Sequence, residues 1–297
     1  MSIKSWVIAA TMLTTATFGA DPLAKEAPAD YRKRVETLLK SDTGWLTVAG
    51  LHWLKPGDTK VGSDPKSDFV LPTGKAPAKL GTFNFDGKTV KFKVEPGVVV
   101  QVNAKPWTSG VLGDDGNDKT ADLLTIGDLS IIVIERGGKY GIRLRDKSSK
   151  YRKEFTHRTW YPVKPEYKIS GKFIPYLQPK HLRVPTVIDG VIEEHESPGE
   201  IEFVLNGKTL KAQVLKADPN QLWLIFRDRT SNKTTYPAGR FLYGDWNPKG
   251  NTVVFDFNKA YNPPCAFTPF ATCPLPPRQN SFSIPIEAGE LTYHIEP

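Results

Sequence analysis

Apolar and polar residues alternate with a period of two through most of the chain, a pattern that predicts short β-strands. The alternation is clearest at 83–94, on both sides of Asp86-Gly87, and at 201–215, around Asn206-Gly207. Asp-Gly or Asn-Gly between two such runs indicates a tight hairpin of type I′. The pattern therefore predicts an all-β, mostly antiparallel protein.

Two further features of the strand pattern are specific enough to check. Trp45–Val48 and Leu51–Leu54 read as two strands joined by a turn at Ala49-Gly50. At the other end, Ser281–Ile286 and Leu291–Ile295 alternate in the same way and are expected to be the closing strands.

One segment departs from this pattern. Between Pro28 and Ser41 apolar residues recur at helical spacing, while arginines and lysines occupy the remaining positions. Asp30 is placed where it can cap the first turn. We expect one N-terminal helix over 28–42, packed on the β body with its basic face in solvent.

The order of these segments suggests the domain organisation. Proline becomes frequent between 162 and 179, although the strand pattern continues there. We expect a β-sandwich over 45–162, then a second antiparallel barrel or sandwich over 163–297.

The first 20 residues resemble a secretory signal peptide. Lys4 precedes a short apolar run, and small residues precede Asp21. Cleavage is expected after Ala20 or Gly19, and the alternative is a buried N-terminal helix. No later segment is apolar enough to cross a bilayer. The mature protein is expected in the periplasm or secreted, with no membrane contact after cleavage.

The composition argues against one class of partner, nucleic acids. The 297 residues carry a formal net charge of +8, but basic and acidic residues are interspersed and no basic run is long. A nucleic-acid partner is therefore not expected.

The stretch Tyr236–Glu290 contains both cysteines, in a proline-rich loop whose backbone is stiff. In an exported protein the spacing of Cys265 and Cys273 favours a disulfide between them. A metal or redox site would favour Cys-x2-Cys or nearby histidines, and the five histidines form no ligand motif. No metal and no cofactor is expected.

Two polar clusters are candidates for binding. Arg143 and Arg145 share one face of a predicted strand, where they can grip an anion or pair with structural carboxylates. The second cluster surrounds the proline loop: Arg240, Asp256, Asn258, Tyr261, Asn262 and Glu290. Its members can line a pocket walled by the loop, or hydrogen-bond the loop's backbone.

These candidates support two hypotheses of function. The first is a non-catalytic module that binds a small polar ligand or a protein partner. The alternative is a hydrolase-like enzyme with Asp256 and Glu290 as acid and base and Arg240 as an anion clamp. The sequence has no nucleophile elbow, phosphate loop or dinucleotide motif.

Several motifs are similar to those of a bacterial and archaeal family named domain of unknown function 1684. They are 141–146, 235–242, 256–269, 273–277 and 286–290. The resemblance spans about Trp45 to Glu290, although Arg278-Gln279-Asn280 stands where family members often have Glu-Asn-Arg. It implies membership and no particular reaction.

A second resemblance concerns the N-terminal half. The segments 61–64 and 69–72, followed by Val102-Asn103 and Gly127-Asp128, are similar to those of the forkhead-associated (FHA) sandwich, a phosphothreonine reader. This resemblance implies that the sandwich over 45–162 is FHA-like. Ser63 occupies the position of that family's phosphate-binding arginine. The resemblance therefore implies the sandwich fold and not phosphopeptide binding.

Overall fold

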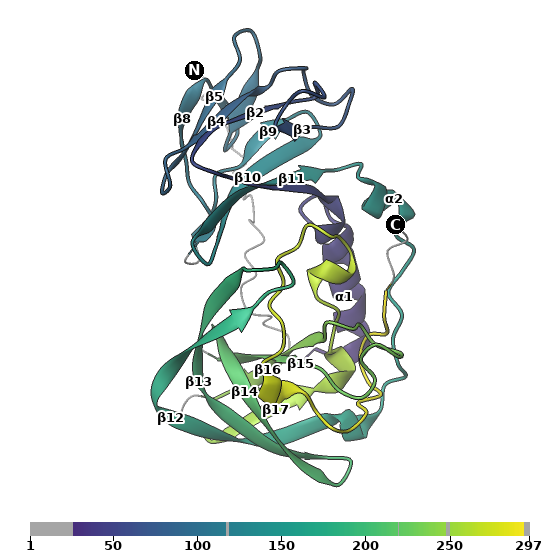
Figure 1. Cartoon of the computed structure of the whole chain (residues 1–297). Helices are drawn as coiled ribbons and strands as arrows, with labels where there is room; N and C mark the ends of the chain where they lie inside the picture. Colours follow the sequence, from purple (N-terminus) through teal and green to yellow (C-terminus); the bar gives the residue numbers. More distant parts are fainter. Residues whose placement is uncertain (1–25, 117–118, 219, 248–249, 294–297) are drawn as a thin grey trace, which may run out of the picture.

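The computed structural model describes residues 26–116, 119–218, 220–247 and 250–293 (Figure 1). The predicted signal peptide lies outside these residues. None of the helices within the described ranges is both long enough and apolar enough to cross a membrane. As predicted, the fold is mostly antiparallel β, with a sandwich followed by a closed barrel.

The N-terminal lobe is a sandwich of two sheets. One sheet contains, in spatial order, β1 (Val48–Trp53), β11 (Lys139–Asp146), β10 (Leu129–Arg136), β9 (Leu124–Ile126), β6 (Val100–Val102) and β7 (Lys105–Trp107). The other contains β3 (Phe69–Val70), β2 (Gly57–Gly62), β4 (Gly81–Phe85), β5 (Val90–Val94) and β8 (Ser109–Leu112). Their inward positions form one core that includes Phe83, Phe92 and Ile131, all fully buried.

The C-terminal lobe is a closed six-stranded barrel, and closure leaves it without edge strands. Its strands are β12 (Lys168–Pro185), β13 (Ile192–Leu205), β14 (Lys208–Asp218), β15 (Gln221–Phe226), β16 (Arg240–Trp246) and β17 (Thr252–Asp256). β12 and β13 form a long hairpin with an irregular register between Pro175 and Lys180.

The predicted helix is confirmed as α1 (Pro28–Lys40), which lies alongside the barrel lobe in Figure 1. Its N-cap is Ala27, without a side-chain hydrogen bond, so the predicted capping by Asp30 is wrong. Asp30 lies in the first turn, where its charge favours the helix dipole. Tyr31 and Leu39 are its buried side chains.

The remaining helical elements that lie wholly within the described ranges are short. They are α2 (Lys150–Glu154) and the 3-10 turns η1 (Trp45–Thr47), η3 (Pro165–Tyr167), η4 (Phe257–Lys259), η5 (Pro264–Ala266) and η6 (Arg278–Asn280). Ser149 caps α2 by accepting a hydrogen bond from the Arg152 amide.

Both predicted hairpins are present. Asn206 and Gly207 have φ of 49° and 71°, as a type I′ turn requires. At Asp86-Gly87 only the glycine has positive φ, and the Asp86 carboxylate accepts the amides of Lys88 and Thr89. The two strands pair at Phe85 and Val90, so the loop is wider than the two residues predicted, and the Asp86 side chain holds it closed.

Two strand predictions at the ends of the β region are wrong. Trp45–Thr47 is the 3-10 turn η1, and β1 runs through Ala49-Gly50 with a bulge instead of turning there. At the C-terminus 281–286 and 291–293 form no strand of a sheet, and 294–297 lie outside the described residues.

The alternation at the C-terminus nevertheless has a structural role. Phe282, Ile284, Ile286 and Ala288 are buried and belong to the barrel core. The segment fills the barrel with every second side chain, while its backbone makes only isolated bridges and single bonds to the lobe. Period-two alternation therefore indicates that one face of a segment is buried, but it does not show that the backbone of the segment pairs with another strand.

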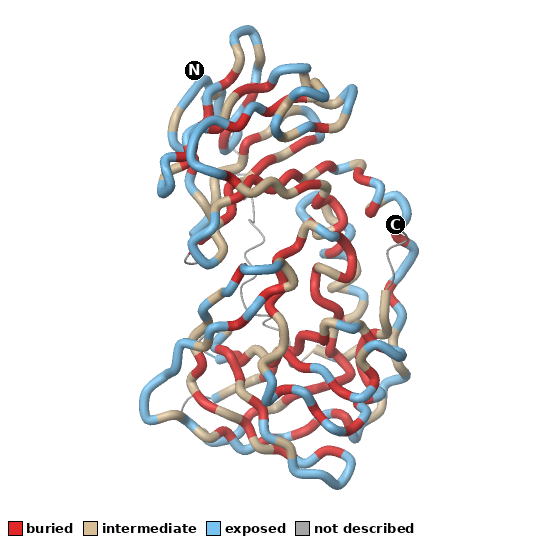
Figure 2. Tube along the Cα trace, viewed as in Figure 1, coloured by how far each residue is buried: buried red, intermediate tan, exposed pale blue. Residues whose placement is uncertain are grey.

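The proline loop, 263–277, runs between the two lobes (Figure 1). Thr268 donates a hydrogen bond to the Val48 carbonyl of the sandwich at 2.9 Å. The carbonyl of Cys273 accepts from the Val187 amide of the barrel lobe at 2.9 Å. Much of the tube in this region is coloured as buried (Figure 2). The loop is therefore hydrogen-bonded to both lobes and helps to hold them together.

Candidate functional site

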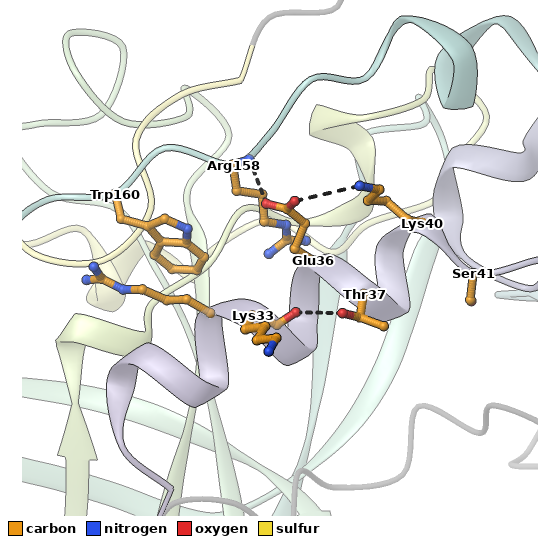
Figure 3. Close-up of a pocket in the computed structure, with 8 residues that line it drawn as sticks. Lys33, Glu36, Thr37, Lys40, Ser41, Arg158 and Trp160 are labelled. Atoms are coloured by element: carbon orange, nitrogen blue, oxygen red, sulfur yellow. Dashed lines mark hydrogen bonds and ion pairs between the residues drawn. The ribbon is translucent and has the colours of Figure 1, made fainter.

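A surface pocket of about 690 Å³ lies between α1 and the segment that follows α2 (Figure 3). It is lined by Arg32, Lys33, Glu36, Thr37, Lys40, Ser41, Arg158 and Trp160. Four of these eight side chains are cationic, one is acidic and one is an indole. This lining favours an anionic ligand.

Arg32 is held in place from two sides. Its Nη2 donates to the carbonyls of Tyr161 at 3.0 Å and Asn258 at 3.2 Å, and its guanidinium lies 4.9 Å from the Trp160 ring centroid. Its Nε is buried without a hydrogen-bond partner among the described atoms. Burial lowers the pKa of Arg32, and the nearby charge of Asp256 opposes that shift. Arg32 is thus a positioned cation with one donor unused.

Arg158 is the second fixed cation. Its Nη1 pairs with Glu290 Oε2 at 3.2 Å, and its backbone amide donates to Glu36 Oε2 at 3.1 Å. The guanidinium also lies 4.9 Å from the Phe267 ring centroid. Its Nε, like that of Arg32, is buried and unpartnered within the described part of the chain.

The other two cations are exposed on α1. Lys40 lies 4.0 Å from Glu36, a surface ion pair of small energetic weight. Lys33 is exposed on the same helix, nearer its N-terminal end than Lys40 (Figure 3). The pocket therefore combines two oriented arginines at its wall with two lysines in solvent.

Several of the predicted site residues lie behind this pocket, where they hold its arginines. The Asn258 carbonyl binds Arg32, and its side chain bonds both backbone groups of Lys164 and the Asp256 carboxylate. Glu290 binds Arg158 and also accepts the Asn262 amide at 2.7 Å. None of these residues lines the pocket itself.

Glu290 is the most perturbed of these groups. Its side chain is fully buried, and this burial raises the pKa of the carboxyl from 4.5 to about 7, although Arg158, Asn262 and Arg240 favour the charged form. Its Oε1 and the Oδ1 of Asn262 are both buried without partners among the described atoms.

Arg240 and Tyr261 are parts of the barrel lobe's interior and wall. Arg240 pairs with Asp228 at 2.7 Å and donates to the carbonyls of Ile286 and Ala288. Tyr261 bridges Phe241 through the backbone, and burial raises the pKa of its hydroxyl well above the usual value. The hydrolase alternative needs Arg240 as a clamp for a substrate anion, but Arg240 is already paired with Asp228. No observation favours that alternative.

Arg143 and Arg145 lie on the sandwich, away from the pocket lining. Arg145 donates to the carbonyls of Thr43 and Gly44 and to Thr47 Oγ1. Arg143 is buried over the Trp45 ring, and burial lowers its pKa to about 9. Both arginines therefore hold β11 against the residues that precede β1, and they have a structural role.

The predicted disulfide is not formed in the structure. Cys265 and Cys273 are free thiols, although the amide of Cys265 donates to Cys273 Sγ at 3.2 Å. Within the described ranges, His, Cys, Asp and Glu side chains do not gather in threes as a metal site would need.

Sequence reasoning missed the pocket's own lining. Arg32, Lys33 and Lys40 were interpreted as a solvated helix face, and Trp160 was not singled out. The signal that points to them is the basic face of a helix packed on an all-β body. It becomes specific only when the fold brings Arg158 and Trp160 beside that face.

Comparisons with known proteins give a family match over part of the chain and no activity. Residues 153–291 match the family described as "Protein of unknown function (DUF1684)", which confirms the resemblance over the barrel lobe and the proline loop. The match does not extend back to Trp45 as predicted. No curated protein matches the chain.

Among solved structures, an uncharacterized protein of Haloarcula marismortui is 24% identical and has a TM-score of 0.41. The alignment covers 48% of this chain and 79% of that one. The FHA domain of FhaA, solved with the intracellular domain of Rv3910, is 16% identical, with a TM-score of 0.23 over 31% of this chain and 96% of that one. A second FHA structure, from a study of phosphothreonine-dependent interactions, is 17% identical with a TM-score of 0.23 over 32% and 92%.

Proposed function

We propose, for a chain whose residues 153–291 match a family of unknown function, that it is an exported, non-catalytic protein that binds a small anion. The binding site is the pocket between α1 and the segment 158–160. The observation that carries the proposal is the excess of cations in this lining, two of them arginines fixed by contacts outside the pocket.

Fixed arginines favour binding because their conformational entropy is lost on folding and not when the ligand arrives. Guanidinium groups suit phosphate and carboxylate oxygens, which accept two parallel N–H donors. Each arginine also has a buried Nε without a hydrogen-bond partner among the described atoms. The Trp160 ring adds apolar surface beside the charges.

Removing the two lysines tests this proposal without disturbing the buried contacts. In Lys33→Ala/Lys40→Ala the affinity for phosphate, sulfate or citrate at low salt is expected to fall about tenfold, since each exposed charge contributes under roughly 1 kcal/mol. Isothermal titration calorimetry gives the affinity.

The matched control is Lys66→Ala/Lys88→Ala, which removes two exposed lysines from the sandwich. It lowers the net charge equally and should leave the affinity within about twofold. Equal losses in both double variants would mean that anions bind the basic surface in general and not this pocket.

Export rests on the N-terminal sequence, Met1–Ala20. Intact mass measurement of the protein from a periplasmic or culture fraction should give a chain that starts at Ala20 or Asp21. A chain that keeps residues 1–19 in the cytoplasmic fraction would contradict export while leaving the pocket proposal untouched.

A further inference from the structure

The two free thiols lie together against the outer wall of the barrel. Cys265 is half-buried and Cys273 is 6% exposed, and the Cys265 amide lies 3.2 Å from Cys273 Sγ. Both belong to a cluster with Ile225 and Phe241. Prolines on each side fix the loop, so the Cys273 sulfur is held against the Cys265 backbone in the native protein.

The surroundings make the two thiols unequal. The hydroxyl of Tyr236 donates to the Cys265 carbonyl at 2.9 Å and also lies beside the Cys265 thiol. The hydrogen bond with the Cys273 thiol is the largest of the effects that hold the pKa of Cys265 below its usual value. Burial raises the pKa of Cys273 well above its usual value. Cys265 therefore ionises first, with the Cys273 thiol as its hydrogen-bond donor.

A buried guanidinium lies on the far side of this pair. Arg143 donates weakly to Thr272 Oγ1, at 3.4 Å, next to Cys273. Among the described residues Arg143 has no carboxylate within ion-pair distance, and its Nε has no partner. Arg136, which also reaches Thr272, is instead paired with Asp115. Negative charge on Cys273 raises the pKa of Arg143, and the charge of Arg143 in turn lowers the pKa of Cys273. Each group therefore stabilises the charged form of the other.

We propose that Cys265 and Cys273 form a reversible thiol–disulfide couple, with Cys265 as the attacking thiolate and Cys273 as the resolving thiol. The half-buried position of Cys265 admits a small oxidant, while the buried Cys273 is reached only through Cys265. Both cysteines are unbonded in the structure.

With hydrogen peroxide as oxidant the steps balance. The Cys265 thiolate attacks one peroxide oxygen, the O–O bond breaks, and a sulfenic acid forms as hydroxide leaves and takes a proton to become water. The Cys273 sulfur then attacks the Cys265 sulfur, the S–O bond breaks, and the departing hydroxide takes the Cys273 proton as a second water. Two thiols lose two electrons to one peroxide, and a dithiol reductant reverses the change.

Two measurements on the wild-type protein test the couple without any variant. Iodoacetamide at pH 7 should alkylate Cys265 at least tenfold faster than Cys273 in the native state, and at about equal rates in urea. Peroxide should remove both free thiols and give a peptide that links Cys265 to Cys273, and dithiothreitol should restore two thiols.

Single variants separate the two roles. In Cys273→Ser, peroxide should leave a Cys265 sulfenic acid that dimedone traps, whereas Cys265→Ser should give no dimedone adduct in the native state. Two thiols that stay free after excess peroxide in the wild type, or disulfides only between molecules, would overturn the proposal.

Discussion

Replacement of Arg240 by alanine is expected to lower the free energy of unfolding by about 3–5 kcal/mol, the usual loss when one partner of a buried ion pair is removed. Arg240 is 1% exposed, and its guanidinium holds Asp228 together with the carbonyls of Ile286 and Ala288. Without it the buried Asp228 carboxylate loses the cation that pairs with it, although Thr230 and Ile286 still donate to it, and two carbonyls of the barrel-filling segment lose a donor. Urea unfolding followed by tryptophan fluorescence measures the effect.

The matched control is Arg229→Ala, an exposed arginine next to Asp228 in the chain, which should change stability by under about 0.5 kcal/mol. A loss below roughly 1 kcal/mol for Arg240→Ala would show that the C-terminal segment is held by its apolar side chains alone.

Stability should fall as the pH rises from about 4.5 to about 7, by roughly 3 kcal/mol from Glu290 alone, since each pKa unit corresponds to about 1.4 kcal/mol. The buried carboxyl has a folded pKa raised to about 7, so in this window the native state keeps a proton that the unfolded chain has released. The contribution is fully present below the unfolded pKa and is lost as the pH passes the folded pKa.

Glu290→Gln removes this proton and should flatten the profile between those pH values, as read from urea unfolding at steps of one pH unit. Glu287→Gln, an exposed carboxylate on the same segment, should leave the slope of the wild type unchanged. A slope that persists in Glu290→Gln would assign the titration to another group.

The fold was predictable from the sequence where a local pattern determines it. Period-two alternation and the turn residues gave the strands of both lobes and the hairpin at Asn206-Gly207, because a hairpin turn depends on neighbouring residues. The closing segment was assigned wrongly for the same reason. Phe282 and Ile284 alternate as in a strand, but what they pack against is the inside of a barrel, which is not encoded locally.

The site was harder to predict because it is built from residues distant in the chain. The proline loop indicated Asn258 and Glu290, and these residues do hold the arginines of the pocket. The arginines themselves, Arg32 and Arg158, lie more than 100 positions earlier in the chain, with sequence separations of 226 and 132 from their partners. No single-sequence pattern connects positions so far apart.

A crystal of the protein soaked in selenate tests the central claim most directly, since selenium scatters anomalously and mimics sulfate in shape and charge. We predict an anomalous peak within hydrogen-bonding distance of Arg32 or Arg158, between α1 and the segment 158–160, that is weaker in Lys33→Ala/Lys40→Ala crystals of the same form soaked at the same concentration. Peaks confined to other basic surfaces, with the pocket empty at the same selenate concentration, would contradict the account.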